Sequence, residues 1–289
     1  MRPAARLRRR LAQDGILVAP GAPDALTARI IEHVGFEAVY FTGAGMAYTH
    51  LGAPDIGLVG LTETVWRVTA VAAATSLPVI VDADDGYGNA LNVRRTVKEL
   101  EQAGAAAVQL EDQVHPKRCG HLAGKRVIPA EEMVGKVEAA VDARTDPALV
   151  IIARTDALAA EGLEGALKRA RRYRQAGADV LFVEAPRSRD ELRAIARALE
   201  GPLMANMVEG GVTPLCTADE LEEMGYRLVI FPNAAVRMAA AAVIRLMETL
   251  RRDGTTADLL NEMLSFHELN DLVDLRAYQD LERRYMPEE

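Results

Sequence analysis

Helical stretches and short apolar runs alternate along most of the chain. Several helical stretches end in Gly, for example at Gly35, Gly104 and Gly177, and an apolar run follows within a few residues. Gly is favoured just past the end of a helix because it tolerates positive φ. Runs that are apolar on both faces and rich in β-branched residues are typical of buried parallel strands. The predicted strands are residues 16–19, 38–42, 79–81, 107–110, 150–153, 180–183, 203–205 and 228–231.

Amphipathic helical stretches separate these strands. Eight alternating strand and helix units in 289 residues predict an α/β fold, a (β/α)8 TIM barrel that forms one domain over residues 1–289. A doubly wound open sheet is the alternative, and it is disfavoured because no Gly-rich turn of the dinucleotide-binding type follows a strand. Residues from about 255 onward form a helical extension with no strand after it. The separating helical stretches include residues 62–75, 91–103, 130–143 and 165–176.

The first 13 residues are rich in Arg and contain no acidic residue. This composition superficially resembles a transit peptide. A strand is expected from about residue 16, which leaves little room for a cleavable segment. We therefore expect an amphipathic helix that covers the floor of the barrel.

The composition argues against several classes of protein. With 49% hydrophobic and 26% charged residues, the chain resembles an ordinary globular protein. Its net charge of −8 argues against a nucleic-acid-binding surface, which needs a clustered basic face. The longest apolar run, near Ala239, is interrupted by Arg245, so no membrane span is expected. Two cysteines, Cys119 and Cys216, cannot build a disulfide framework or a zinc cluster, and they favour a reducing, cytoplasmic location.

Polar side chains follow the predicted strands at the point where each strand ends. In (β/α)8 barrels these C-terminal ends carry the chemistry. Carboxylates at several strand ends form a ring with at least one Arg inside it, which is costly unless a cation neutralises it. The strand-end segments are residues 42–45, 82–86, 111–113 and 154–156, followed by Glu184, Asn206 and the stretch that runs on to Arg237.

Asp82, Asp84 and Glu111 predict a divalent cation. Asp82 and Asp84 are two residues apart, so their side chains face the same side of the strand, and Glu111 is expected on the neighbouring strand. Hard carboxylate oxygens without an accompanying His favour Mg²⁺, or Mn²⁺, over zinc. The alternative is that Asp82 or Asp85 merely caps the following turn.

Arg154 and Asn206 are candidates for substrate binding. An Arg at a strand end can bind an anionic oxygen group through two parallel hydrogen bonds. The alternative for Arg154 is an ion pair with Glu111 or Glu184. Asn206 is a short amide at a strand end, where a structural hydrogen bond explains it as well as a substrate contact does.

The segment PKRCGH, residues 116–121, lies in a long loop after the fourth predicted strand. Cys119 has cationic or titratable neighbours at Lys117, Arg118 and His121, and such surroundings lower the pKa of a thiol and suit it to proton transfer. The glycine after Cys119 gives the loop freedom to close as a lid.

Purely structural interpretations of the cysteines and histidines stay open. The alternative for Cys119 is a buried inert thiol, which is what we expect for Cys216, just before a predicted N-cap at Thr217. Zinc binding by Cys119 and His121 is disfavoured because other soft ligands are lacking. His115 is expected to be solvated.

These segments resemble the isocitrate lyase/phosphoenolpyruvate mutase superfamily, and in particular its short methylisocitrate-lyase-like branch. The resemblance covers nearly the whole chain, from Gly21 to the tail. The block KRCGH, residues 117–121, is typical of members with a catalytic cysteine on a gating loop. Further matching segments are residues 51–55 (LGAPD), 82–84 (DAD), 110–113 (LEDQ), 153–156 (ARTD) and 205–207 (ANM).

The resemblance implies a lyase that acts on a 2-hydroxy acid. Loss of the hydroxyl proton would break a C–C bond to give a 2-oxo acid such as pyruvate, and Cys119 would protonate the carbanion that leaves. Lys117, His121 and Arg154 are implied as the other members of the catalytic set. A metabolite-binding protein without activity is disfavoured, because the metal carboxylates and the loop thiol are all present.

The resemblance also implies a ligand set and an assembly. Mg²⁺ would be bound by Asp82 and Asp84, with Glu111 acting through water and Asp55 in the outer shell. The barrel would form dimers by exchanging its last helix, and two dimers would make a homotetramer. The residues implied to bind a small carboxylate substrate are Tyr40, Thr42, Gly43, Ala44, Gly120, Glu184, Asn206 and Arg237.

The exact substrate stays open. Arg237 matches an Arg that methylisocitrate lyases use for a distal carboxylate, yet Phe266 falls where those enzymes carry a second Arg. The turn at residues 42–45 departs from the Ser-Gly-Gly-Gly that is usual in those enzymes. The stretches at 208–211 and 265–266 look more like carboxyphosphoenolpyruvate phosphonomutases and dimethylmalate-type lyases, but the phosphonomutases lack the Arg at position 237. We favour cleavage of a methylisocitrate- or dimethylmalate-like substrate. The alternatives are a carboxyphosphoenolpyruvate phosphonomutase and an oxaloacetate decarboxylase or hydrolase.

Overall fold

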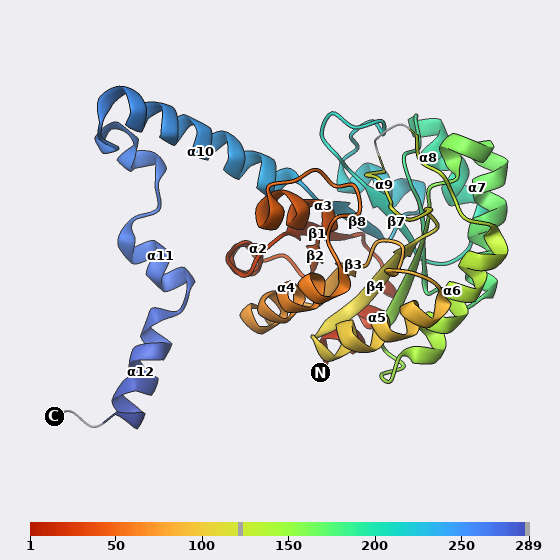
Figure 1. The fold of residues 1–289 in the computed structure, drawn as a ribbon, viewed down its shortest axis with the longest axis horizontal. Helices are drawn as coiled ribbons and strands as arrows, with labels where there is room; N and C mark the ends of the chain where they lie inside the picture. The colour runs from red at the N-terminus through yellow and green to blue at the C-terminus, as the bar shows by residue number, and fades with distance from the viewer. Residues whose placement is uncertain (121–123, 287–289) are drawn as a thin grey trace.

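The computed structural model describes residues 1–120 and 124–286, and within these ranges the chain folds around a closed barrel of eight parallel strands (Figure 1). The strands pair in chain order, and β1 also pairs with β8, so Leu17 lies opposite Leu228. This closure shows that the open-sheet alternative is wrong. The strands are β1 (Leu17–Ala22), β2 (Val39–Phe41), β3 (Val79–Asp82), β4 (Ala105–Glu111), β5 (Val150–Thr155), β6 (Val180–Val183), β7 (Leu203–Asn206) and β8 (Leu228–Phe231).

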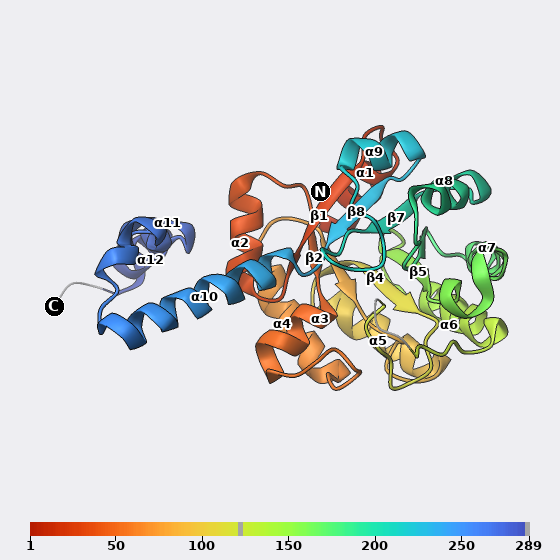
Figure 2. The same cartoon turned by 90° about the horizontal axis from the view of Figure 1, so that it is seen from above.

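Helices between the strands form the outer layer of the barrel (Figures 1 and 2). The predicted helix at residues 130–143 has the bounds of α6 (Ala130–Ala143), and α4 (Leu61–Ala74) and α5 (Ala90–Gln102) start and end within one residue of their predicted bounds. The remaining elements up to β8 are α2 (Ala25–Val34), α3 (Gly43–Met46), η1 (Ala47–Leu51), α7 (Leu158–Gln175), α8 (Arg189–Ala198) and α9 (Ala218–Met224).

Two apolar layers stabilise this arrangement. Outward-facing strand residues such as Val81 and Val108 pack against the inner faces of the helices, through residues such as Val97 on α5. Inward-facing residues such as Ile80 and Phe182 fill the barrel itself. Because successive strand residues point to opposite faces, each strand contributes to both layers, which explains its nearly unbroken apolar sequence.

The basic N-terminus forms the expected amphipathic helix, α1 (Pro3–Leu11). Its apolar face places Ala4, Leu7 and Leu11 in the cluster that fills the barrel interior. Its Arg side chains reach outward to bond the ends of strands and loops: Arg8, for example, donates to Asp179 and to the backbone of residues 148 and 149. The helix therefore closes the floor of the barrel, as predicted.

The chain after β8 leaves the barrel. α10 (Ala234–Asp253) runs outward, and the C-terminal arm, residues 254–286, lies beyond it (Figures 1 and 2). The arm contains η2 (Ala257–Glu262), α11 (Phe266–Leu272) and α12 (Leu275–Tyr285), and it touches the barrel where Arg29 on α2 donates to the carbonyl of Leu272. Many large apolar side chains of this region are exposed, including Met238, Ile244, Met247, Phe266, Tyr278 and Leu281.

No helix within the described ranges is both long and apolar enough to cross a membrane.

Replacing Leu7 by Ala tests the role of α1. Because Leu7 is 1% exposed in the interior cluster, we expect the free energy of unfolding to fall by about 2–5 kcal/mol. Urea unfolding followed by circular dichroism measures this loss. Arg9→Ala, at an exposed position of the same helix, is the matched control and should change little. Equal stability of the two variants would contradict the assignment of α1 as a structural plug.

Candidate active site

Buried charge is concentrated at one end of the barrel. In the described part of the chain, seven of the eight buried acids lie at the C-terminal end of a strand or in the loop directly after it, and Asp55 lies in the loop between η1 and α4. The buried cations number four. Such an excess of carboxylates is unstable in a low-dielectric environment unless protons or further cations compensate it. The acids are Asp55, Asp82, Asp84, Asp85, Glu111, Asp112, Asp156 and Glu184, and the cations are Lys117, Lys136, Arg154 and Arg169.

Asp82 and Asp84 point their side chains to one place. Asp82 is the last residue of β3, and Asp84 follows in a left-handed conformation with φ of 47°, which is rare for a non-Gly residue and typical of functional sites. A Cβ atom built on Gly43 would lie 3.1 Å from Asp82 Oδ2 and 3.3 Å from Asp84 Oδ1. The two carboxylate oxygens therefore converge on the space beside Gly43.

Hydrogen bonds fix one oxygen of Asp82 and leave the other directed at this space. Asp82 Oδ1 accepts from the backbone N–H of Asp84 at 3.2 Å and from Gln109 Nε2 at 3.2 Å. Gln109 in turn accepts from the hydroxyl of Tyr40 at 3.1 Å. The capping role that was the alternative for Asp82 is thus present, but it uses a single oxygen.

Lys117 is the cation nearest to this acid pair. Its Nζ lies 2.5 Å from Asp55 Oδ1 and 2.7 Å from Asp84 Oδ1. Burial raises the pKa of Asp84 to about 7 against the opposing effect of Lys117, and Asp82 and Asp55 add to the rise. The same carboxylates hold the pKa of Lys117 well above its usual value although burial acts in the other direction. One lysine therefore does not balance these three carboxylates.

The donor set fits Mg²⁺ bound by two carboxylates and water. Among the described residues no group of three or more His, Cys, Asp or Glu side chains is close enough to form a metal cluster. Mg²⁺, however, retains several waters and is commonly held by one or two carboxylates. The converging oxygens beside Gly43 provide two, and Glu111 has a buried oxygen, Oε1, with no hydrogen-bond partner in the described structure. Such an orphaned acceptor suits a bound water.

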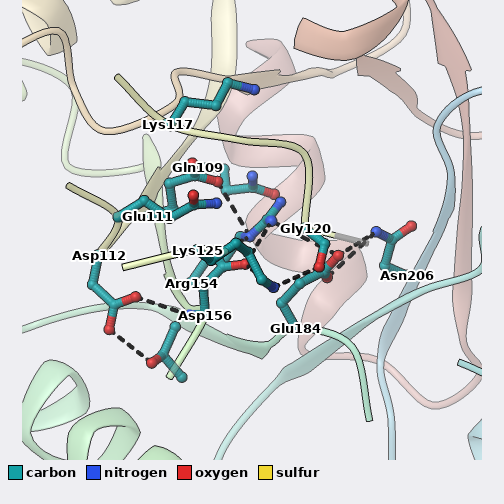
Figure 3. A network of polar contacts seen from close by, with 12 residues as sticks. Gln109, Glu111, Asp112, Lys117, Gly120, Lys125, Arg154, Asp156, Glu184 and Asn206 are labelled. Carbon is teal, nitrogen blue, oxygen red and sulfur yellow. Dashed lines mark hydrogen bonds and ion pairs between the residues drawn. The ribbon is translucent and has the colours of Figure 1, made fainter. Parts of the chain in front are cut away.

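Arg154 lies at the centre of a second cluster of acids (Figure 3). Parallel pairing of β4 and β5 places Glu111 opposite Arg154, and their side chains are 3.3 Å apart. Arg154 also donates from Nε and Nη2 to both oxygens of Asp156, at 2.8 and 3.1 Å, and its Nη2 lies 3.7 Å from Glu184. The ion-pair alternative for Arg154 is therefore realised, with both acids that were named for it.

The two acids beside Arg154 differ in proton affinity. Burial raises the pKa of Glu111 well above its usual value, with Arg154 opposing the rise. Burial would also raise the pKa of Asp156, but Arg154 and Lys125 outweigh it and lower that pKa to about 2. Asp156 is consequently the permanent anion that holds the guanidinium in place. Glu184 accepts from Asn206 Nδ2 at 3.2 Å, and the other amide atom, Asn206 Oδ1, is buried without a hydrogen-bond partner in the described structure.

A small cavity over the barrel brings most of the predicted residues together. Its polar side carries the acids and Arg154, while Val208, Ile230 and Pro232 give it an apolar side. The predicted residues that line it are Tyr40, Thr42, Ala44, Asp55, Asp82, Lys117, Cys119, Gly120, Arg154, Glu184 and Asn206.

The Cys119 thiol lies on the loop between β4 and α6 and lines this cavity. The Cys119 amide donates to the carbonyl of Asp55 at 3.1 Å, and Gln113 accepts from the amide of Arg118 and donates to its carbonyl. The loop thus places Cys119 at the same cavity as Asp82 and Arg154. His121, also predicted for the site, lies outside the described residues.

Other predicted residues lie elsewhere. Arg237, on α10, is not among the described residues that line the cavity. Its Nη1 donates to the backbone carbonyl of Glu209 and lies 3.5 Å from the side-chain carboxylate of the same residue. The expectation of a simply solvated His115 is wrong in part, because its ring lies 3.0 Å from Asp85 although the side chain is 59% exposed. Cys216 is buried beside Met207, as expected of a structural cysteine.

Sequence reasoning assigned no role to four polar residues of the site, although Asp156 lies in the strand-end segment 154–156. Gln109 lies two positions before Glu111, and Asp156 lies two positions after Arg154. Because side chains two apart on a strand face the same side, this spacing could have indicated that both residues belong to the site. Asn233 accepts a hydrogen bond from Thr42, and Lys125 bonds Asp156. For these two the contacts join segments far apart in sequence, and no local pattern indicates them.

The chain is similar to proteins of one family over most of its length. A family model described as phosphoenolpyruvate phosphomutase matches residues 7–251. The 2,3-dimethylmalate lyase of Eubacterium barkeri is 48% identical over 99% of each chain. The chloroplastic carboxyvinyl-carboxyphosphonate phosphorylmutase of Arabidopsis thaliana is 46% identical over 97% of this chain and 84% of its own. The 2-methylisocitrate lyase of Aeropyrum pernix is 45% identical over 98% and 90%.

Solved structures agree with this similarity. A crystal structure of 2,3-dimethylmalate lyase, a member of the PEP mutase/isocitrate lyase superfamily, superimposes with a TM-score of 0.94 at 40% identity, over 99% of this chain and 96% of that one. Phosphonopyruvate hydrolase in complex with oxalate and Mg²⁺ superimposes with a TM-score of 0.90 at 30% identity, over 99% of this chain and 100% of that one.

Replacing Asp156 by Asn tests the cluster around Arg154. The carboxylate has a pKa of about 2 in the folded chain against 3.8 for an ordinary Asp, so its contribution is present above about pH 4 and is lost as the pH falls through 2. We expect a loss of about 2 kcal/mol in the free energy of unfolding at pH 7, and a smaller loss at pH 3.

Urea unfolding at the two pH values measures both losses. Asp142→Asn, at a carboxylate with a side chain 75% exposed, is the control and should have little effect at either pH. A loss for Asp156→Asn that stays the same at pH 3 would show that its charge is not what matters.

Proposed function

The chain belongs to the phosphoenolpyruvate phosphomutase family, and from that premise we propose that it is a Mg²⁺-dependent carbon–carbon lyase that cleaves a 2-hydroxy dicarboxylate to a 2-oxo acid. The observation that carries the proposal is the cavity at the barrel rim, because Cys119, Arg154 and the acid Asp82 all line it. A thiol acid, a fixed guanidinium and a metal-binding carboxylate are the groups that such a cleavage requires.

Asp82 and Asp84 are the residues that would hold the metal ion, with Glu111 contributing through water. When bound, Mg²⁺ supplies positive charge that polarises the substrate oxygens next to the bond that breaks. The convergence of the two carboxylates beside Gly43 supports this assignment. The structure of the similar phosphonopyruvate hydrolase, in complex with Mg²⁺ and oxalate, a small dicarboxylate, supports the choice of Mg²⁺ as the ion.

Arg154 would bind and orient a substrate carboxylate. Arg154 is 7% exposed, and its guanidinium donates two hydrogen bonds to Asp156. The guanidinium therefore cannot turn away from the cavity without breaking a bidentate ion pair. Asn206 offers a second polar contact, since its buried Oδ1 has no hydrogen-bond partner in the described structure. Fixed groups of this kind stabilise charge without the cost of reorganisation during the reaction.

Cys119 would act as the acid. When the C–C bond breaks, the bonding electron pair stays on the carbon of the departing fragment, and the thiol proton passes to that carbon. The proton lost from the substrate hydroxyl restores the thiol, so no proton is gained or lost overall. Cys119 and Gly120 line the cavity, where they would limit the access of water, which would otherwise protonate the carbanion unselectively.

The cavity favours a short substrate with alkyl substituents. Val208, Ile230 and Pro232 form an apolar side that suits methyl groups. Arg237, which would bind a distal carboxylate, is instead engaged by Glu209. We therefore place a dimethylmalate-like dicarboxylate ahead of the tricarboxylate 2-methylisocitrate. The similarity to 2,3-dimethylmalate lyase agrees with this order.

We also propose that the protein is a homotetramer, formed by two dimers that exchange their C-terminal helices. The exposed apolar side chains of α10 and the C-terminal arm support this, because an apolar surface of this extent is normally covered by a partner. A second copy of the chain, with the same arm, is the simplest partner for such a symmetric exchange.

The function is tested by release of 2-oxo acid from purified protein. We expect Mg²⁺-dependent formation of a 2-oxo acid from 2,3-dimethylmalate, a lower kcat/KM with 2-methylisocitrate, and no activity after chelation of the metal. Cys119→Ser should lower kcat by about 100-fold or more, since general acid catalysis contributes about 10²–10⁴-fold. Lactate dehydrogenase coupling, or mass spectrometry of the products, measures both.

Cys216→Ser is the matched control, because it removes the other thiol, which is buried away from the cavity, and it should keep wild-type activity. Formation of a C–P bond from carboxyphosphoenolpyruvate, with no cleavage of either hydroxy acid, would replace the lyase by a phosphonomutase. Full activity of Cys119→Ser would remove the thiol from the acid role.

The assembly is tested by light scattering after size-exclusion chromatography. We expect a mass near four times the 31.3 kDa of the chain. Truncation after residue 253 should give smaller species, because it removes the arm. A full-length chain that elutes as a monomer at micromolar concentration would contradict the tetramer.

A further inference from the structure

Lys125 connects the loop that carries Cys119 to the acid cluster beneath it (Figure 3). Its Nζ donates to the carbonyl of Gly120 at 2.5 Å and to Asp156 Oδ1 at 2.7 Å. The side chain of Lys125 is only 6% exposed, although it lies on a surface loop. A buried ammonium group that bridges a loop carbonyl and a carboxylate is a strong, charge-assisted contact.

We propose that Lys125 is a positioning residue, which latches the Cys119–Gly120 segment over the cavity and so sets the thiol where it can deliver its proton. The consequence for catalysis rests on the proposed function, whereas the latch itself does not. None of the sequence motifs considered above includes Lys125.

Backbone contacts of Cys119 and of Gly120 hold this segment in place. On one side, the amide of Cys119 donates to the carbonyl of Asp55 at 3.1 Å. On the other side, the carbonyl of Gly120 accepts from Lys125. The first contact joins two neutral backbone groups, whereas the second involves a full charge and is about twice as strong. Of these two contacts, the one made by Lys125 is the stronger, so its loss should free the Gly120 side of the segment.

Gly120 packs against Glu184 and Arg154, two of the residues proposed to bind the substrate. A Cβ atom added there would lie 2.3 Å from Glu184 Oε1 and 2.4 Å from Arg154 Nη2, so the backbone of the loop packs against both side chains. Glycine at this position permits the close approach. The latch thus holds Gly120 in contact with the groups assigned to bind the substrate.

The other end of the latch is rigid. Asp156 is 1% exposed, and its backbone amide donates to Asp112 at 2.8 Å. Asp112 in turn accepts from Thr155 Oγ1 and Tyr173 OH, each at 2.7 Å. Because Asp156 also holds Arg154, the same carboxylate positions the guanidinium and, through Lys125, the thiol. This shared anchor couples loop closure to the orientation of Arg154.

The latch is tested without turnover, by the rate at which iodoacetamide alkylates Cys119 in the full-length chain. Mass spectrometry of the peptide that contains residue 119 follows the reaction. In Lys125→Met we expect alkylation to be about 10- to 100-fold faster, which corresponds to the loss of one charge-assisted hydrogen bond that holds the segment closed. Removal of a cation would by itself leave less thiolate and slow the reaction, so acceleration reports exposure of the thiol.

Lys98→Met, at an exposed lysine of α5, is the matched control and should alkylate at the wild-type rate. Lys125→Arg keeps a cation that can reach a carbonyl and a carboxylate, and it should restore at least part of the protection. If the Met variant does not fold, Lys125→Gln, which lacks the charge but keeps a donor, carries the same test. Alkylation of the folded Met or Gln variant at the wild-type rate would overturn the latch, even if the melting temperature falls.

The kinetic readout separates positioning from substrate binding. In Lys125→Met, kcat for cleavage should fall about 10- to 100-fold while KM changes by less than about threefold, because the lost contact acts on the acid after the substrate has bound. A rise in KM with unchanged kcat would assign Lys125 to binding instead. If neither variant nor wild type cleaves any hydroxy acid, the proposed function fails while the alkylation result still decides the latch.

Discussion

The balance of buried charge at the barrel rim is the constraint on which the rest of the site depends. Within the described residues, eight carboxylates are withdrawn from water at one end of the barrel, and four buried cations and the Lys125 ammonium compensate only part of their charge. An isolated buried carboxylate is costly enough that it either takes up a proton or acquires a cation. The raised pKa of Asp84 and the lowered pKa of Asp156 show these two outcomes within one site.

The distribution of the cations divides the rim into two halves. In one half, Arg154 and Lys125 both form ion pairs with Asp156 and balance its charge, so these side chains are held in place. Around Asp82 and Asp84, Lys117 is the nearest buried cation, and it pairs with Asp84 Oδ1 and with Asp55. One lysine does not balance these three carboxylates, so the space where Asp82 Oδ2 and Asp84 Oδ1 converge is short of positive charge. A fixed anion-binding half beside a cation-deficient half is the arrangement expected for a substrate that is itself anionic and binds together with a metal ion.

The barrel makes this division possible because its interior is packed and rigid. Inward-facing residues such as Ile80 and Phe182 fill the strands below the rim, and α1 closes the floor. Polar side chains at the strand ends therefore stand on a base that cannot relax around them. The loop that carries Cys119 is held to that base by polar contacts, which can be broken and remade, so rigidity below and adjustability above coexist in one site.

The sequence alone determined the order and type of the elements and most of the residues at the rim. Apolar runs and glycine-terminated helices are local patterns, and the polar residues that end each strand could be read directly, including Asp82, Asp84, Glu111 and Arg154. The segment around Cys119 indicated chemistry through its composition, and the resemblance to a known superfamily supplied the roles.

The tertiary structure decided which of these residues meet, and with what charge. The contact of Lys125 with Asp156 spans 31 residues of chain, and that of Thr42 with Asn233 spans 191, so no local pattern encodes either. The engagement of Arg237 by Glu209, outside the cavity, was equally invisible in the sequence, where both are simply charged residues. The physical reason is that burial and Coulomb interactions depend on distances in space, and these are fixed only when the barrel closes.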